Sequence, residues 1–143
     1  MMIAASRLLA PGHVASERTA DHKDLLSGLR ILVVEDEVLI AVELKAAFVE
    51  AGAEVCYART LARGLAALDG QAFDAAILDV TLSATSTCLP IARALTQLGV
   101  PILVHSGDLD RKGELVSEIG AAVLAKPATA AQVLRRLLTV LDA

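Results

Sequence analysis

Acidic residues follow directly after the first strongly apolar run of this sequence. In "RILVVEDEVL", the aliphatic residues 31–34 lead into Glu35, Asp36 and Glu37, and a further acid, Asp79, interrupts the apolar run of "AAILDVTL". Carboxylates that lie close together and away from water repel one another, and a divalent cation with oxygen ligands relieves that repulsion. A carboxylate beside such an ion can attack a phosphoryl group to form an acyl phosphate. The acids therefore predict a magnesium site, with Asp79 as the nucleophile.

Two further polar residues end apolar runs. Ser106 ends "VPILVHS" and Lys126 follows "AAVLA". Phosphoryl transfer depends on positioning and on neutralising the phosphoryl oxygens, which an ammonium and a hydroxyl group can do. Taken singly, each residue has a plainer explanation: a turn serine, a surface lysine or, for Glu37, an acid that complements a helix dipole. The case for function depends on their meeting at one place.

The elements around these residues predict such a meeting. Short aliphatic runs predict five strands, over residues 31–34, 54–58, 73–80, 100–106 and 121–127. Helical spacing predicts five helices between and after them, over residues 40–51, 61–68, 89–98, 114–119 and 129–141. Thr60 and the pair Thr129 and Gln132 are predicted to cap two of these helices, and Gly52 is predicted to stop the first. Strict alternation is typical of an α/β fold with one doubly wound parallel sheet, whose functional crevice lies beyond the carboxyl ends of the strands. Glu35, Asp79, Ser106 and Lys126 all fall at that edge.

The amino-acid composition argues against several other classes of protein. The 143 residues suffice for one domain, 55% are hydrophobic and 2% aromatic, and the net charge is -4 with scattered basic residues, which argues against a nucleic-acid interface. No apolar stretch approaches the roughly 20 residues of a membrane span, so we expect a soluble protein. In "MMIAASRLLA" Arg7 interrupts the apolar part and no charged region precedes it, unlike a signal peptide, so we expect the protein to be cytoplasmic. Cys56 and Cys88 indicate neither a disulfide nor a zinc site. Residues 1–28 lack a period and are predicted to be a flexible leader to a domain over residues 29–143.

The spaced set "VVEDE", "ILDVTL", "ILVHSG" and "LAKP" resembles the receiver domain of bacterial two-component response regulators, over residues 29–143 and most closely the stand-alone or kinase-associated receivers of alphaproteobacteria. The resemblance implies a flavodoxin-like (βα)5 fold with strand order 2-1-3-4-5. It also implies that Asp79 takes a phosphoryl group from a histidine kinase or a phosphotransfer protein. Mg²⁺ or Mn²⁺ would be held by Glu35, Asp36, Asp79 and the backbone carbonyl of Thr81.

The resemblance assigns several further positions. Lys126 and Ser106 would contact the phosphoryl group, and the peptide bond between Lys126 and Pro127 would be cis. Thr81 and Asp108 would tune a slow self-dephosphorylation, the only catalysis expected. Output would pass to a partner protein through the face formed by the fourth helix, the fifth strand and the fifth helix, because only Asp142 and Ala143 follow the last predicted helix.

The sequence departs from this family at two places. The switch position of the fifth strand, usually aromatic, is Val123, and a valine has no ring to move when the hydroxyl residue shifts. The loop after Asp79, "SATSTCLP", is rich in small hydroxyl residues. These departures support an alternative, a receiver that no longer cycles phosphate and serves as a constitutive docking module.

Two other classes of protein fit the sequence less well. A hydrolase of the haloacid dehalogenase type needs a second acid where Thr81 stands, and a dinucleotide-binding protein needs a G-x-G-x-x-G that does not follow the first strand. His105 should lie on the opposite side of its strand from Ser106 and have a structural role. The apolar stripe of the last helix is interpreted as core, and whether the protein forms a homodimer is left open.

Overall fold

The computed structural model describes residues 24–83, 86–107, 113 and 116–142. Its five strands form one parallel sheet in the order β2-β1-β3-β4-β5. The strands are β1 (Arg30–Val34), β2 (Glu54–Ala58), β3 (Ala75–Leu78), β4 (Ile102–Ser106) and β5 (Ala122–Ala125). This arrangement confirms the predicted fold class and strand order.

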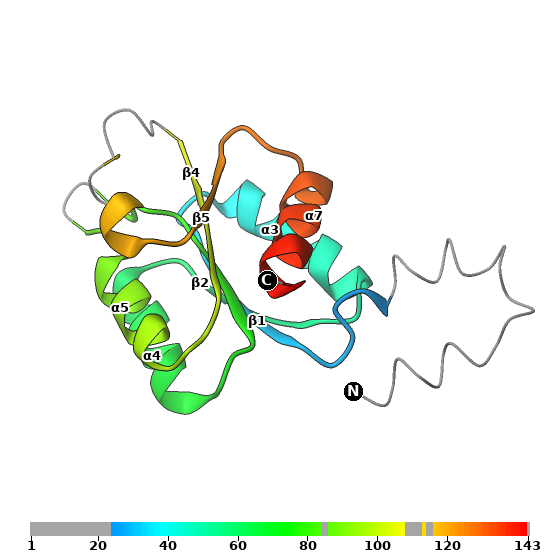
Figure 1. Cartoon of the computed structure of the whole chain (residues 1–143), viewed down its shortest axis with the longest axis horizontal. Helices are drawn as coiled ribbons and strands as arrows, with labels where there is room; N and C mark the ends of the chain where they lie inside the picture. Colours follow the sequence, from blue (N-terminus) through cyan, green and yellow to red (C-terminus); the bar gives the residue numbers. More distant parts are fainter. Residues whose placement is uncertain (1–23, 84–85, 108–112, 114–115, 143) are drawn as a thin grey trace, which may run out of the picture.

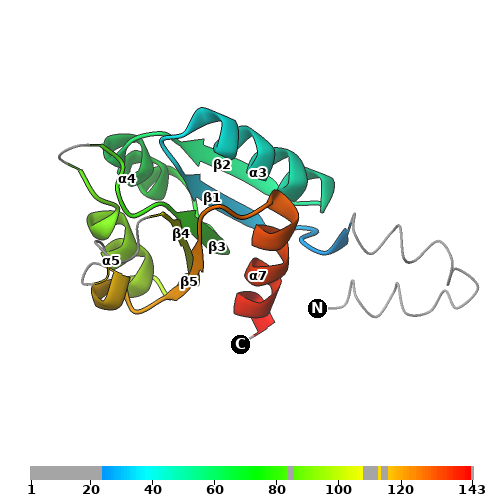
Figure 2. The same cartoon turned by 90° about the horizontal axis from the view of Figure 1, so that it is seen from above.

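Helices cover both faces of the sheet. The helices with fully described bounds are α3 (Val38–Glu50), α4 (Leu61–Gly70), α5 (Leu89–Gln97) and α7 (Ala130–Asp142). Figures 1 and 2 show α3 and α7 on one side of the sheet and α4 and α5 on the other. Residues 116–119 of the predicted fourth helix are helical, and residues 114–115 lie outside the described part. Each described helix is too short or too polar for a transmembrane span.

The strands supply two cores because their side chains alternate between the faces. From β1, Leu32 and Val34 pack with residues of α5, whereas Ile31 and Val33 pack with residues of α3 and α7. All four side chains are buried. A continuous aliphatic run is therefore needed in β1, and the acids can begin only where the strand ends.

Local signals fix where several helices begin. The Thr60 hydroxyl accepts a hydrogen bond from the Arg63 N–H at 3.1 Å, and Thr129 and Gln132 cap the start of α7 reciprocally, at 3.1 and 2.8 Å. Gly52 follows α3 with φ 98°, a conformation that glycine adopts without strain. These predicted caps and stops are confirmed.

Three strands are shorter than predicted, and β3 is the most informative. We expected residues 73–80, but pairing is confined to Ala75–Leu78. β3 begins only at Ala75, because the Arg30 N–H donates to the Asp74 carboxylate at 2.8 Å rather than to a backbone carbonyl. At the other end, the Asp79 N–H donates to the Val34 carbonyl at 3.0 Å, so Asp79 stays aligned with the neighbouring strand although β3 has ended.

Part of the predicted leader belongs to the packed domain. The Leu26 side chain is fully buried with the residues of α3 and α7, and its N–H donates to the Ala51 carbonyl at 2.8 Å. Sequence periodicity could not reveal this contact, because the leucines of the short segment "DLLSGL" are too few to establish a helix or strand period. Residues 1–23 lie outside the described part.

Candidate functional site

Residues from four strand ends meet at the carboxyl edge of the sheet. Glu35 follows β1, Asp79 follows β3, Ser106 ends β4 and Lys126 follows β5. Glu35 is 2% exposed, Asp79 5% and Ser106 0%. The Lys126 N–H donates to the Ser106 carbonyl at 3.0 Å, which fixes the lysine backbone beside β4. The structure thus brings together the four residues that the sequence placed at this edge.

Four carboxylates share the centre of the site. Glu35, Asp36, Glu37 and Asp79 each offer an oxygen, and these oxygens lie within 4.8 Å of one another. Glu35 and Asp79 are buried, Asp36 is half-buried and Glu37 is exposed. Asp36, predicted as a ligand from its place in "VVEDE", therefore lies in the same cluster as Asp79.

Lys126 holds three of these acids. Its ammonium donates to Glu37 Oε1 at 2.8 Å, to Glu35 Oε1 at 3.1 Å and to Asp79 Oδ2 at 3.2 Å. The Ser106 hydroxyl donates to Asp79 Oδ1 at 3.0 Å. Each oxygen of the Asp79 carboxylate is therefore contacted by a different donor, an ammonium on one side and a hydroxyl on the other.

Burial and like charge shift the protonation of the site. Burial raises the pKa of Glu35 to about 7, and the nearby Asp79 charge adds to the rise. The pKa of Asp36 is also raised, first by burial and then by Asp79. Burial opposes the charge on Lys126, but its hydrogen bond to Glu37 and the Asp79 and Glu35 charges outweigh burial, so the pKa of Lys126 is raised. The ammonium stays charged while Glu35 and Asp36 retain their protons unusually strongly.

This donor set fits a hard divalent cation. Among the described residues, four carboxylates face one ammonium, so these groups carry an excess of negative charge when the acids are ionised. Magnesium and manganese prefer carboxylate, carbonyl and water oxygens, which are what this edge offers. The acids could therefore hold Mg²⁺ or Mn²⁺.

Glu37 is the site residue that sequence reasoning assigned elsewhere. We interpreted it as an acid that complements the helix dipole. It does stand at the N-cap of α3, but its side chain makes no capping hydrogen bond and instead pairs with Lys126. The signal was present in the unbroken run "EDE". No local pattern links this run to Lys126, because Lys126 lies 89 residues away in the chain.

The remaining predicted positions surround this centre. Thr81 is half-buried and forms an isolated bridge with Thr87 in the loop after Asp79. Val123, at the switch position, is half-buried in β5 and packs against the core on the α5 side. The peptide bond between Lys126 and Pro127 is cis, as predicted. Asp108 lies outside the described residues.

His105 lies beneath the site on the other face of β4. It follows Leu103 on the face that packs against α3 and α7, away from Ser106, as strand alternation predicts. The side chain is 1% exposed, and neither ring nitrogen has a hydrogen-bond partner among the described residues. Burial lowers the pKa of His105, with the Lys126 charge adding to the effect, so the ring is neutral near pH 7. It fills space rather than carrying charge.

Solved structures share this fold. A response regulator receiver protein from Sinorhizobium medicae superposes with a TM-score of 0.71 at 23% identity, covering 80% of this chain and 95% of that one. A chain described as a response regulator from Chloroflexus aurantiacus superposes with a TM-score of 0.69 at 26% identity, covering 80% of this chain and 98% of that one. The receiver domain of NtrX from Brucella abortus superposes with a TM-score of 0.69 at 24% identity, covering 79% of this chain and 98% of that one.

Other comparisons set limits on this likeness. The chain spans 27% of a longer NtrX chain from Brucella abortus, to which it has a TM-score of 0.70. No family model matches the sequence, and no curated protein matches it. The agreement therefore lies in the arrangement of five strands and their helices. This chain has the flavodoxin-like receiver fold, and its structural neighbours are the receiver domains of response regulators.

Proposed function

We propose that this chain is a response regulator whose Asp79 accepts a phosphoryl group from a histidine kinase or a phosphotransfer protein, in a reaction that requires Mg²⁺ or Mn²⁺. One observation carries the proposal. The Asp79 carboxylate lies at the edge of the sheet between an ammonium donor and a hydroxyl donor, with three other acids around it. The response regulator neighbours support the same conclusion.

Asp79 acts as the nucleophile. One carboxylate oxygen forms a bond to phosphorus as the bond between phosphorus and the donor's imidazole nitrogen breaks, and that nitrogen keeps the electron pair. The product is an acyl phosphate on Asp79. The backbone of Asp79 is held in place by the hydrogen bond that its N–H donates to the Val34 carbonyl.

Lys126 and Ser106 position the transferred group. The Lys126 ammonium and the Ser106 hydroxyl donate to the Asp79 carboxylate at 3.2 and 3.0 Å. Both groups are therefore close enough to donate to the oxygens of a phosphoryl group on Asp79. The raised pKa of Lys126 keeps it charged for this role. Slow loss of the phosphoryl group to water is the only catalysis we assign, and Thr81 and Asp108 tune its rate.

Glu35, Asp36, Asp79 and the Thr81 carbonyl would hold the cation. When bound, Mg²⁺ or Mn²⁺ supplies positive charge that offsets the clustered acids and the incoming phosphoryl oxygens. Glu37 has a different role in this scheme. Its hydrogen bond of 2.8 Å holds the Lys126 ammonium toward the acids, which makes Glu37 a positioning residue.

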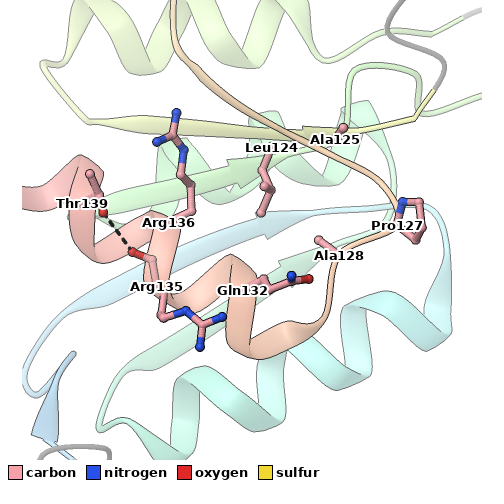
Figure 3. A pocket seen from close by; sticks show the side chains of 8 residues that line it. All are labelled: Leu124, Ala125, Pro127, Ala128, Gln132, Arg135, Arg136 and Thr139. Carbon is pink, nitrogen blue, oxygen red and sulfur yellow. Dashed lines mark hydrogen bonds between the residues drawn. The ribbon is translucent and has the colours of Figure 1, made fainter.

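Output passes to a partner protein in the cytoplasm through the surface around β5. A shallow hollow of about 350 Å³ lies between β5 and α7. Figure 3 shows the side chains that line it, among them Leu124 of β5, Ala128 and, from α7, Arg135 and Arg136. Because Val123 offers no ring to report on Ser106, we expect the signal to reach this surface through backbone shifts of β4 and β5.

Phosphodonor treatment tests the proposal. The full chain is incubated with acetyl phosphate and Mg²⁺ and analysed by intact mass spectrometry, and beryllofluoride binding is followed by thermal shift. We expect one phosphoryl group on wild type and none on Asp79→Asn, whereas Asp69→Asn, which removes an exposed acid on α4, stays reactive. Wild type without an adduct or a thermal shift would overturn the proposal.

A second candidate is the non-cycling docking module. Val123 favours it, since the aromatic switch is absent. The same experiment separates the two, because a non-cycling module forms no phosphoryl adduct at Asp79 and shows no thermal shift with beryllofluoride. Turnover of a generic phosphate ester would instead indicate a hydrolase.

A further inference from the structure

The outer face of α3 exposes an unusual amount of apolar surface. Helix α3 already buries Leu44 and Phe48 against the sheet. On its other side, Leu39 is 81% exposed, Val42 57% and Val49 50%. Counting Val38, this helix carries four of the seven large exposed hydrophobic residues in the described part of the chain. Contiguous apolar surface of this kind marks interaction sites more often than scattered residues do.

These residues form one stripe. Leu39, Val42, Ala46 and Val49 follow one another at steps of three, four and three residues, and all four are exposed. That spacing places them along a single line of the helix, at the a and d positions of two heptads. A stripe with this repeat fits the side of another α-helix, whose own residues fill the gaps between its side chains.

Charges beside the stripe select the partner. Lys45 and Glu50 flank it on opposite sides, at a g position and at the following e position, and neither forms an ion pair with a described residue. In a parallel pair of identical helices, g of one helix faces the following e of the other, so Lys45 would meet Glu50 twice. An antiparallel pair would bring Glu43 toward Glu50 and Lys45 toward its own copy.

We propose that α3 is a homodimer interface, in which two copies of the chain pack their Leu39–Val42–Ala46–Val49 stripes in parallel around a two-fold axis. The interface is self-complementary, as such symmetry requires. Two heptads with one alanine bury little surface, so the association is weak and depends on concentration. This inference does not rest on the proposed phosphoacceptor function, because no residue of the stripe belongs to the acidic site.

Sedimentation velocity of the full chain over a range of concentrations tests the interface. We expect a reversible monomer–dimer equilibrium for wild type. Val42→Glu should weaken it by about tenfold or more, because a carboxylate would lose water in the stripe. Leu98→Glu adds the same charge at a residue that is 66% exposed outside α3, and it should leave the equilibrium unchanged. A wild type that stays monomeric, or a Val42→Glu variant that dimerises like wild type, would overturn the proposal.

A charge exchange tests the parallel orientation. Lys45→Glu and Glu50→Lys should each weaken the dimer, and the double variant should restore it. Ala46→Cys in a Cys56→Ser background should form a disulfide between two copies, since equivalent a positions face each other only in the parallel pair. Failure of both the restoration and the disulfide would exclude this interface. Retained dimerisation by Asp79→Asn would show that the interface is independent of the phosphoacceptor.

Discussion

The two edges of the sheet treat charge in opposite ways. At the amino edge, the Arg30 guanidinium pairs with Glu54 at 2.9 Å, with the side chains 41% and 74% exposed, and the Arg30 N–H contacts the Asp74 carboxylate. At the carboxyl edge, Glu35 and Asp79 are buried beside two further acids and share one lysine. The same five strands therefore end in a solvated ion pair on one side and a crowded acidic site on the other.

The contrast separates charges that the fold tolerates easily from charges that reduce its stability. An exposed pair costs little and contributes little, because water screens it. Buried acids without enough partners lower stability, which the raised pKa of Glu35 expresses directly. A site that keeps such a cost is a candidate for function, and the following experiments test the comparison.

The largest effect is expected on removing Lys126, the cation that pairs with three acids of the carboxyl edge. Lys126→Met should lower the free energy of unfolding of the metal-free protein by about 3–5 kcal/mol near pH 8, because it leaves buried charges uncompensated. Urea denaturation measures this. Arg63→Met, which removes an exposed cation on α4, is the matched control and should change stability little. A loss no larger than that of the control would mean that the acids are not held by Lys126.

The pH dependence of the metal-free protein should follow Glu35. The folded state keeps this proton up to about pH 7, whereas the ordinary pKa is 4.5, so the folded state binds more protons in that window. Stability should therefore fall as pH rises from about 5 to about 8, by on the order of 3 kcal/mol at most. Glu35→Gln should flatten the profile. An unchanged profile in that variant would assign the effect to other groups.

A smaller gain is expected from relieving repulsion. Asp36→Ala should stabilise the metal-free protein by about 0.5–1 kcal/mol, the size of a surface charge interaction, while weakening magnesium binding. Thermal melts with and without Mg²⁺ measure both effects. A metal-free variant that melts below wild type would contradict the picture of crowded acids.

The smallest effect is expected at the amino edge. Arg30→Gln removes an exposed ion pair but keeps the backbone N–H that contacts Asp74, so it should change the free energy of unfolding by less than about 1 kcal/mol. It should also leave phosphorylation by acetyl phosphate intact. A loss comparable to that of Lys126→Met would erase the difference between the two edges.

Periodic features were predictable from the sequence. The aliphatic runs located all five strands, and the caps at Thr60 and Thr129 located two helix starts. Strand ends were less predictable. β3 begins only after Asp74, whose carboxylate accepts a hydrogen bond from the backbone of Arg30, a residue 44 positions earlier. Buried Leu26 was missed for a related reason, since its partners lie in α3 and α7 rather than in its own segment.

The amino-acid sequence by itself determined that acids, a serine and a lysine must stand at the ends of parallel strands, because apolar runs and helical periods alternate without exception. Tertiary structure alone decided how these groups pair. Glu37 contacts Lys126 rather than capping its helix, and Ser106 and Lys126 take separate oxygens of Asp79. The reason is that strand pairing sets which residues are neighbours across the sheet edge, and such distances of a few ångströms between residues far apart in the chain are not encoded in any local pattern.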